Sequence, residues 1–110
     1  MGASKSESFS IEHNQTAQLF KALSHPAKIA IIEFLLSTDS CICGDIVNQL
    51  PLSQPTVSQH LKELKNVGLI KGSIEGTAIC YCIDESGFDK ISEFFIQINQ
   101  HIDKNKIKCC

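Results

Sequence analysis

The hydrophobic period of the chain changes at Gly68, and this change limits the possible folds more than any other feature. Before Gly68, apolar residues recur every three or four positions, which predicts a helix over residues 53–67 with one buried face. The residues of that face are Val57, Leu61, Leu64 and Val67. After Gly68 the pattern alternates, which predicts strands at residues 69–74 and 78–83 around a turn at Glu75-Gly76-Thr77. A short helix pair that leads into a hairpin is typical of a winged helix-turn-helix.

The remaining segments complete a mainly α fold with a small β-hairpin (α+β), with about five helices and a two-stranded wing. Its 110 residues fit one domain. Helical periodicity and capping residues predict further helices at residues 11–23, 27–37, 42–50 and 87–103. We expect a flexible N-terminal tail at residues 1–10 and a flexible, cysteine-containing tail at 104–110. Residues 11–103 would then form the winged helix-turn-helix domain, with its terminal helices used for dimerisation.

Helix boundaries are marked by residues with clear conformational preferences. Pro26 suits the first turn of the helix at residues 27–37. Ser53 is a good N-cap for the helix at 53–67, and Gly68 suits the position just after its last turn. These residues sharpen the expected limits of the central helix.

The exposed face of the helix at residues 53–67 is rich in uncharged polar side chains. Such donors and acceptors can reach base edges or phosphates of duplex DNA, while the apolar face holds the helix in place. The residues expected to contact DNA are Ser53, Gln54, Thr56, Ser58, Gln59, His60 and Lys62, with Lys65 and Lys71 on phosphates. An ordinary amphipathic helix with a solvated face is the alternative that periodicity alone leaves open.

Charge sets a limit on how such a helix could read DNA. The formal net charge is -2, which counts mildly against nucleic-acid binding as a bulk property. All 10 basic residues are lysines, so bidentate arginine–guanine contacts are excluded. No apolar run approaches the roughly 20 residues that span a bilayer, and the first ten residues are polar, so we expect a cytoplasmic protein without membrane contact.

Residues 52–70 read LSQPTVSQHLKELKNVGLI, and FKALSHP precedes the second helix. These stretches closely resemble the ArsR/SmtB family of metalloregulatory repressors, and the likeness covers residues 19–83. The resemblance implies a homodimeric winged-helix repressor that pairs through its first and last helices. It also implies binding to double-stranded operator DNA and release when an inducer binds. Many relatives carry arginines at the tip of the wing, which this chain lacks, so the resemblance leaves contact of the wing with the minor groove open.

Six cysteines fall in three close pairs. Cys41 and Cys43 match the family's Cys-Val-Cys inducer site, although the flanking residues match only in part. On a helix beginning near Ile42, residues two apart diverge by about 200°, so both could bind one ion only if the helix start unwound. The second-rank candidates are the strand pair Cys80 and Cys82 and the tail pair Cys109 and Cys110. The expected inducer is As(III), Sb(III), Cd or Zn, and none is required for folding.

The sequence leaves three functions open. The first is a repressor released by a thiophilic ion, and the second is a DNA-binding repressor switched by cysteine oxidation. The third, a thiol enzyme or metal-buffering protein, is disfavoured because the chain has no Cys-X-X-Cys, no evident Cys–His pair and no phosphate loop. We therefore expect a regulator and not an enzyme.

Overall fold

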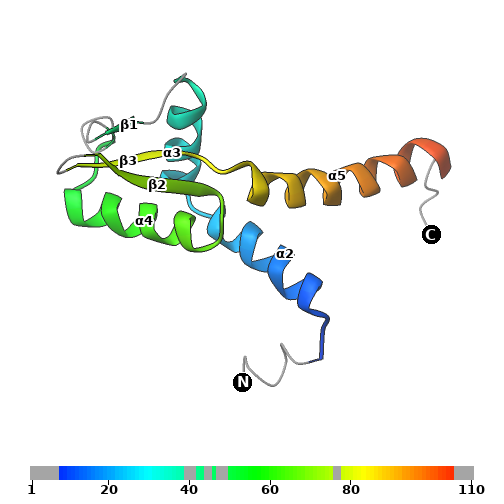
Figure 1. The fold of residues 1–110 in the computed structure, drawn as a ribbon. Helices are drawn as coiled ribbons and strands as arrows, with labels where there is room; N and C mark the ends of the chain where they lie inside the picture. Colours follow the sequence, from blue (N-terminus) through cyan, green and yellow to red (C-terminus); the bar gives the residue numbers. More distant parts are fainter. Residues whose placement is uncertain (1–7, 39–41, 44–45, 47–49, 76–77, 106–110) are drawn as a thin grey trace.

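The structure, a computed structural model, describes residues 8–38, 42–43, 46, 50–75 and 78–105. Figure 1 shows a small body of helices and a sheet from which one long helix extends. The described elements are α2 (Ile11–Ala22), α3 (Pro26–Leu36), β1 (Ile42–Cys43), α4 (Gln54–Asn66), β2 (Ile70–Glu75), β3 (Ala78–Ile83) and α5 (Glu85–Asn105). This order confirms the winged helix-turn-helix architecture.

The core lies where α3 and α4 pack against each other and against the sheet. Ile31 of α3 and Val57 and Leu64 of α4 are each 0% exposed, as is Cys80 of β3. Three of the four predicted stripe residues of α4 are buried, namely Val57, Leu61 and Leu64, and Val67 is partly buried against the same cluster. The apolar period therefore predicted the correct inward face of this helix.

The end of α4 shows how the chain passes from helix to strand. Gly68 adopts φ 84°, a left-handed conformation that glycine reaches without a Cβ penalty. The amide of Gly68 donates to Lys65 O at 3.1 Å, and that of Leu69 donates to Leu64 O at 3.1 Å, which together make a Schellman cap. Gly87 donates to Gly68 O at 3.1 Å and comes so close that a Cβ there would clash with that carbonyl. The start of α5 is thereby fixed to the end of α4.

The sheet is antiparallel and has the strand order β1-β3-β2. The hairpin of β2 and β3 confirms the predicted wing, with Ile70 opposite Ile83 and Ser73 opposite Cys80. The third strand, β1, pairs Ile42 with Tyr81 and Cys43 with Cys80. The sequence did not predict this third strand.

The helix predicted at residues 42–50 is wrong at its start, because Ile42–Cys43 is a strand. Pairing with β3 satisfies the backbone groups of these two residues, so the helical alternative has no advantage there. Residues 44–45 and 47–49 lie outside the described residues. The described part of the chain contains four α-helices, against the five or so expected.

The helix α5 leaves the body of the molecule soon after it begins. Among the residues of α5 whose side chains are described, Ile91 is the last that is buried, and every residue from 92 to 102 is exposed. Phe20 of α2 meets the rings of Phe94 and Phe95 with centroid distances of 5.6 and 5.7 Å. Among the described helices, none is both long and apolar enough to cross a membrane.

Candidate functional site

The outer face of α4 carries the predicted DNA contacts. Nearly all of these side chains are exposed, while the opposite face of the helix is buried in the core. The exposed members are Ser53, Gln54, Thr56, Ser58, Gln59, Lys62 and Lys65. Lys71 is also exposed and follows them on β2. The structure thus brings the set together on one helix and the adjoining strand.

The first turn of α4 is arranged differently from a standard N-cap. Ser53 occupies the N-cap position, but its side chain makes no capping hydrogen bond. Its hydroxyl instead lies 2.9 Å from the hydroxyl of Thr56, and either group can be the donor. The Ser53 side chain therefore does not occupy the first backbone N–H groups of α4, which are the kind of groups that bind phosphate oxygens at helix starts.

His60 lies between α4 and α3, away from the outer face. Its side chain is only 12% exposed, and its ring centroid lies 4.6 Å from that of His25. Its Nδ1 is buried without a hydrogen-bond partner and lies 3.9 Å from Glu63. A base contact by His60, as expected from sequence, does not fit this burial. The spacing of the residues already indicated this burial, because His60 lies three residues after Val57 and four before Leu64.

An ion pair braces α4 against α3. Lys28 of α3, 9% exposed, pairs with the Glu63 carboxylate, and Gln59 Nε2 donates to the same carboxylate at 3.1 Å. The Lys28 ammonium, followed by the Gln59 amide, holds the pKa of Glu63 below its usual value. This contact engages one of the predicted DNA-reading side chains. The ion pair was not predicted from the sequence, although a lysine within the apolar helix 27–37 was a signal.

The base of the wing carries a second ordered carboxylate. Asp84 accepts hydrogen bonds from the hydroxyl and the backbone amide of Ser86 at 2.8 and 3.0 Å. The Ser86 hydroxyl and then its amide lower the pKa of Asp84, and Lys71 adds a smaller effect. This arrangement fixes the turn between β3 and α5, next to the exposed Lys71.

The cysteines of the two central pairs lie on neighbouring strands. Cys80 is 0% exposed and its sulfur forms a disulfide, whereas Cys82 carries a thiol and is half-buried. Cys43 stands opposite Cys80 in the ladder. Cys41, Cys109 and Cys110 lie outside the described residues. Among the side chains that the structure describes, no group of three or more His, Cys, Asp or Glu could hold a metal ion.

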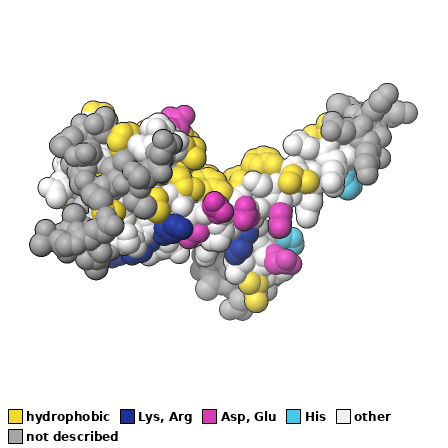
Figure 2. Space-filling view, turned by 45° about the horizontal axis from the view of Figure 1, so that its top comes forward, with side chains coloured by type: hydrophobic (Ala, Val, Ile, Leu, Met, Phe, Trp, Pro, Cys, Tyr) yellow, Lys and Arg dark blue, Asp and Glu magenta, His cyan; other side chains and the backbone are white. Residues whose placement is uncertain are grey.

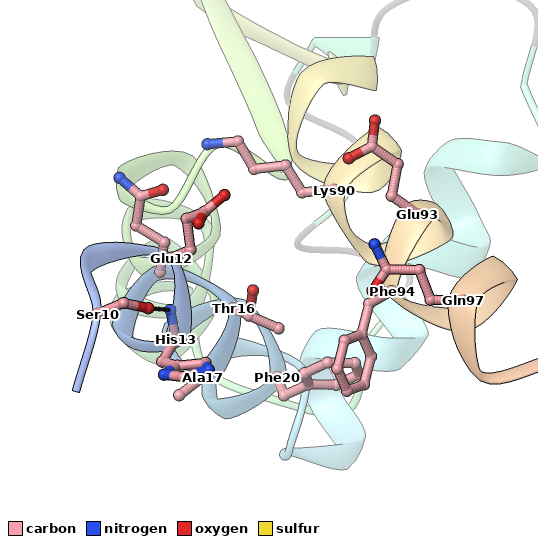
Figure 3. Close-up of a pocket in the computed structure, with 11 residues that line it drawn as sticks. Ser10, Glu12, His13, Thr16, Ala17, Phe20, Lys90, Glu93, Phe94 and Gln97 are labelled. Carbon is pink, nitrogen blue, oxygen red and sulfur yellow. Dashed lines mark hydrogen bonds between the residues drawn. The ribbon is translucent and has the colours of Figure 1, made fainter.

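A second surface of interest lies between α2 and α5. A cleft of about 670 Å³ is lined by residues of both helices. Figure 3 shows Phe20 and Phe94 together on one side of it and Lys90 and Glu93 on the opposite side. Phe95 and Ile98 of α5 are 47% and 38% exposed. Figure 2 shows hydrophobic side chains continuing from the body of the molecule onto the extended helix. So much exposed apolar area on one helix is typical of an interaction surface.

Comparison with known proteins matches residues 25–71 to the family described as "Bacterial regulatory protein, arsR family". An uncharacterised HTH-type transcriptional regulator of Methanocaldococcus jannaschii is 32% identical over 90 residues, covering 81% of this chain and 97% of that protein. A cadmium resistance transcriptional regulatory protein CadC homolog of Staphylococcus aureus is 36% identical over 78 residues, covering 70% and 64%. The arsenical resistance operon repressor of Staphylococcus xylosus is 28% identical over 93 residues, covering 84% and 82%.

Solved structures have the same fold. An ArsR-like transcriptional regulator from a Rhodococcus species aligns with a TM-score of 0.69 at 22% identity, covering 84% of this chain and 87% of that one. A Mycobacterium bovis fragment, described as a homodimeric winged helix-turn-helix DNA-binding domain, aligns with a TM-score of 0.62 at 22% identity, with 88% of each chain covered. At these identities the likeness concerns the fold.

Proposed function

Because this chain belongs to the ArsR family of bacterial HTH-type transcriptional regulators, we propose that it is a repressor that binds operator DNA through α4. A thiophilic ion bound by cysteine thiolates would release it. The observation that carries the proposal is the exposed, mostly uncharged polar face of α4 above the buried Val57 and Leu64. The relatives are transcriptional regulators, so we propose no enzymatic role. Such a regulator would act in the cytoplasm, where the DNA lies.

The proposed division of DNA contacts follows from side-chain chemistry and exposure. Gln54 and Ser58 would meet base edges, since glutamine can bind adenine through two hydrogen bonds. Lys62, Lys65 and Lys71 would meet phosphates, which position the helix without reading sequence. We leave His60 out of the base-reading set because its side chain is largely buried against α3.

We propose that the protein binds DNA as a homodimer paired through α2 and α5. The apolar surface formed by Phe94, Phe95 and Ile98 supports this pairing, since a monomer gains nothing by exposing it to water. The homodimeric M. bovis relative supports it too. Two copies of α4 would then read two half-sites about one helical turn apart.

Cys41 and Cys43 are the proposed ligands of the inducer, with Cys80, Cys82, Cys109 and Cys110 as further thiol candidates. Cysteine thiolates suit soft ions, and two relatives are named for cadmium and arsenical resistance. We therefore propose As(III), Sb(III), Cd or Zn as the inducer. In extended backbone, residues two apart share a face, so an extended segment needs no unwinding for both sulfurs to reach one ion.

The test is binding of the reduced protein to its own promoter fragment, followed by fluorescence anisotropy. Arsenite or cadmium should release the DNA, and the double variant Cys41→Ser, Cys43→Ser should bind the DNA but ignore the ion. If arsenite, cadmium and zinc all leave the DNA affinity of the wild type unchanged, the proposed inducer is wrong. If no promoter DNA is bound at all, the repressor assignment fails as well.

A second candidate function, switching by cysteine oxidation, is supported by the disulfide at Cys80. In this case peroxide would change the DNA affinity and a dithiol reductant would restore it. The same anisotropy experiment separates the two candidates, because the oxidation model predicts that arsenite and cadmium leave the DNA affinity of the reduced protein unchanged. If peroxide leaves the DNA affinity unchanged, the oxidation model is wrong.

A further inference from the structure

Glu63 connects the DNA-reading helix α4 to α3 through both of its carboxylate oxygens. Oε1 pairs with the ammonium of Lys28 on α3, and Oε2 accepts a hydrogen bond from Nε2 of Gln59 at 3.1 Å. Gln59 lies about one turn before Glu63 and is exposed, whereas the side chain of Lys28 is only 11% exposed. One carboxylate therefore links a buried ammonium to an exposed side chain on the outer face of α4.

The neighbours of Glu63 hold its carboxylate in place and keep it ionised. Moving the carboxylate away would leave the largely buried Lys28 ammonium without its counter-ion, which is strongly unfavourable. His60 Nδ1 lies 3.9 Å from the same oxygen that Lys28 contacts. The Lys28 ammonium, followed by the Gln59 amide, lowers the pKa of Glu63, so the group is a carboxylate at neutral pH. An ionised carboxylate accepts hydrogen bonds and donates none.

This carboxylate determines which way the amide of Gln59 faces. A glutamine amide has a donor end, the NH₂ group, and an acceptor end, the carbonyl oxygen, and turning the amide over exchanges the two. Only the NH₂ end can bond to the ionised Glu63. The carbonyl oxygen of Gln59 is therefore the end that Glu63 does not use, and it is available to DNA.

We propose that Lys28 and Glu63 are positioning residues that make Gln59 select an amino base, adenine or cytosine, in the major groove of the operator. The inference rests on the proposed repressor that binds DNA through α4, and it adds a specificity determinant. Adenine N6 and cytosine N4 carry donors in the major groove, whereas guanine O6 and thymine O4 are acceptors. A fixed carbonyl oxygen bonds to an amino group and is repelled by a keto oxygen.

The fixed orientation matters because the chain has few other ways to distinguish bases. All of its basic residues are lysines, so the bidentate arginine–guanine contact is excluded. Base reading then depends on uncharged side chains such as Gln59. A glutamine whose amide turns over freely offers a donor to keto bases and an acceptor to amino bases, and so distinguishes them poorly. Anchoring by Glu63 removes that ambiguity.

The experiment measures base preference at each position of the protein's own promoter fragment by competition in fluorescence anisotropy. Gln59→Ala identifies the base pair that Gln59 meets, as the position in each half-site where the preference falls. There the wild type should favour the two base pairs with the amino base on one strand over the two reversed pairs by about tenfold, within the usual cost of one mismatch. Glu63→Gln should largely abolish this ratio and leave the ratios at other positions unchanged.

Two further variants separate positioning from a general effect of charge. Glu33→Gln removes a negative charge from an exposed position on α3 and should keep the wild-type ratio. Lys28→Met removes an ammonium that is too buried to contact DNA itself, and should lower the ratio at the Gln59 position alone. Each ratio compares two DNA fragments on one protein sample, so a partly unfolded variant still reports it.

The outcomes distinguish this inference from the proposed function. An undiminished ratio in Glu63→Gln or in Lys28→Met overturns the inference, as does a preference that groups A·T with T·A against G·C with C·G. If Gln59→Ala alters the preference at no position, the inference is also wrong. In each of these cases the repressor assignment stands if the wild type prefers its promoter to a scrambled fragment. Equal affinity for those two fragments refutes the proposed function itself.

Discussion

The two amphipathic helices α4 and α5 use their apolar faces in opposite ways. In α4 the apolar residues are covered by the rest of the chain, with Val57 and Leu64 each 0% exposed. In α5 the apolar residues beyond Ile91 remain uncovered, with Phe94 and Phe95 41% and 47% exposed. The polar face of α4 is directed to solvent, and the apolar face of α5 is directed there too.

The apolar face of α4 is covered within one chain, whereas the apolar face of α5 needs a second protein surface to cover it. A helix whose apolar face is satisfied and whose outer face is uncharged and polar is suited to a hydrated, hydrogen-bonding partner such as DNA. A helix that leaves large apolar residues exposed is suited to a second protein surface. The two faces thus divide DNA reading and dimerisation between them.

The largest expected effect is on the covered face of α4. Leu64→Ala should lower the free energy of unfolding by about 3 kcal/mol, because a fully buried leucine is replaced by a cavity. Lys62→Ala, on the exposed face of the same helix, should change it by less than about 0.5 kcal/mol. Urea unfolding at fixed protein concentration measures both. Equal losses in the two variants would contradict the assignment of the faces.

The next effect concerns the uncovered face of α5. The double variant Phe94→Glu, Phe95→Glu should be monomeric in light scattering, because carboxylates cannot be buried in an apolar interface. Its promoter affinity should fall on the order of 100-fold, since two linked half-site contacts become independent. The exposed Asp89→Asn on the same helix is the control. A double variant that remains dimeric would show that α5 is not the interface.

Removal of single lysines should have a smaller effect, of a particular kind. Lys65→Gln and Lys62→Gln should each reduce the slope of log K against log salt by about 0.9, if each lysine neutralises one phosphate. Preference for the promoter over a scrambled fragment should not change, because phosphate contacts carry no sequence information. A slope that stays at the wild-type value would place that lysine away from DNA.

The smallest effect concerns the brace between α3 and α4, and it depends on pH. Because Lys28 and Gln59 lower the pKa of Glu63, the stabilisation is present above the ordinary glutamate pKa and is lost as pH falls through the lowered one. Glu63→Gln should reduce Tm at neutral pH, leaving the buried Lys28 without its carboxylate. The difference from wild type should shrink in acid, and a difference that is constant with pH would refute the pairing.

The sequence predicted best those elements that local patterns determine. The apolar period predicted the buried face of α4, the alternation predicted the hairpin, and Gly68 and Pro26 marked helix ends where the structure has them. The family resemblance is likewise carried by a continuous stretch, which the match at residues 25–71 largely contains.

The sequence did not predict the features that depend on residues far apart in the chain. The strand at Ile42–Cys43 exists because β3, almost forty residues later, offers a backbone edge, and the helix expected there was inferred from local residues alone. His60 was assigned to the polar face although its spacing from Val57 places it beside the core, where it meets His25. The opposition of Cys43 and Cys80 likewise depends on the strand register, which neither cysteine pair reveals by itself.

The most direct test of the account is a comparison of two DNA fragments of equal length and base composition, the protein's own promoter and a scrambled version. In anisotropy titrations at one salt concentration, the wild type should prefer the promoter by on the order of 1,000-fold or more. The double variant Gln54→Ala, Ser58→Ala should lose most of that preference while keeping its affinity for the scrambled fragment. Equal affinity of the wild type for both fragments, or an undiminished preference in the variant, would contradict DNA reading by α4.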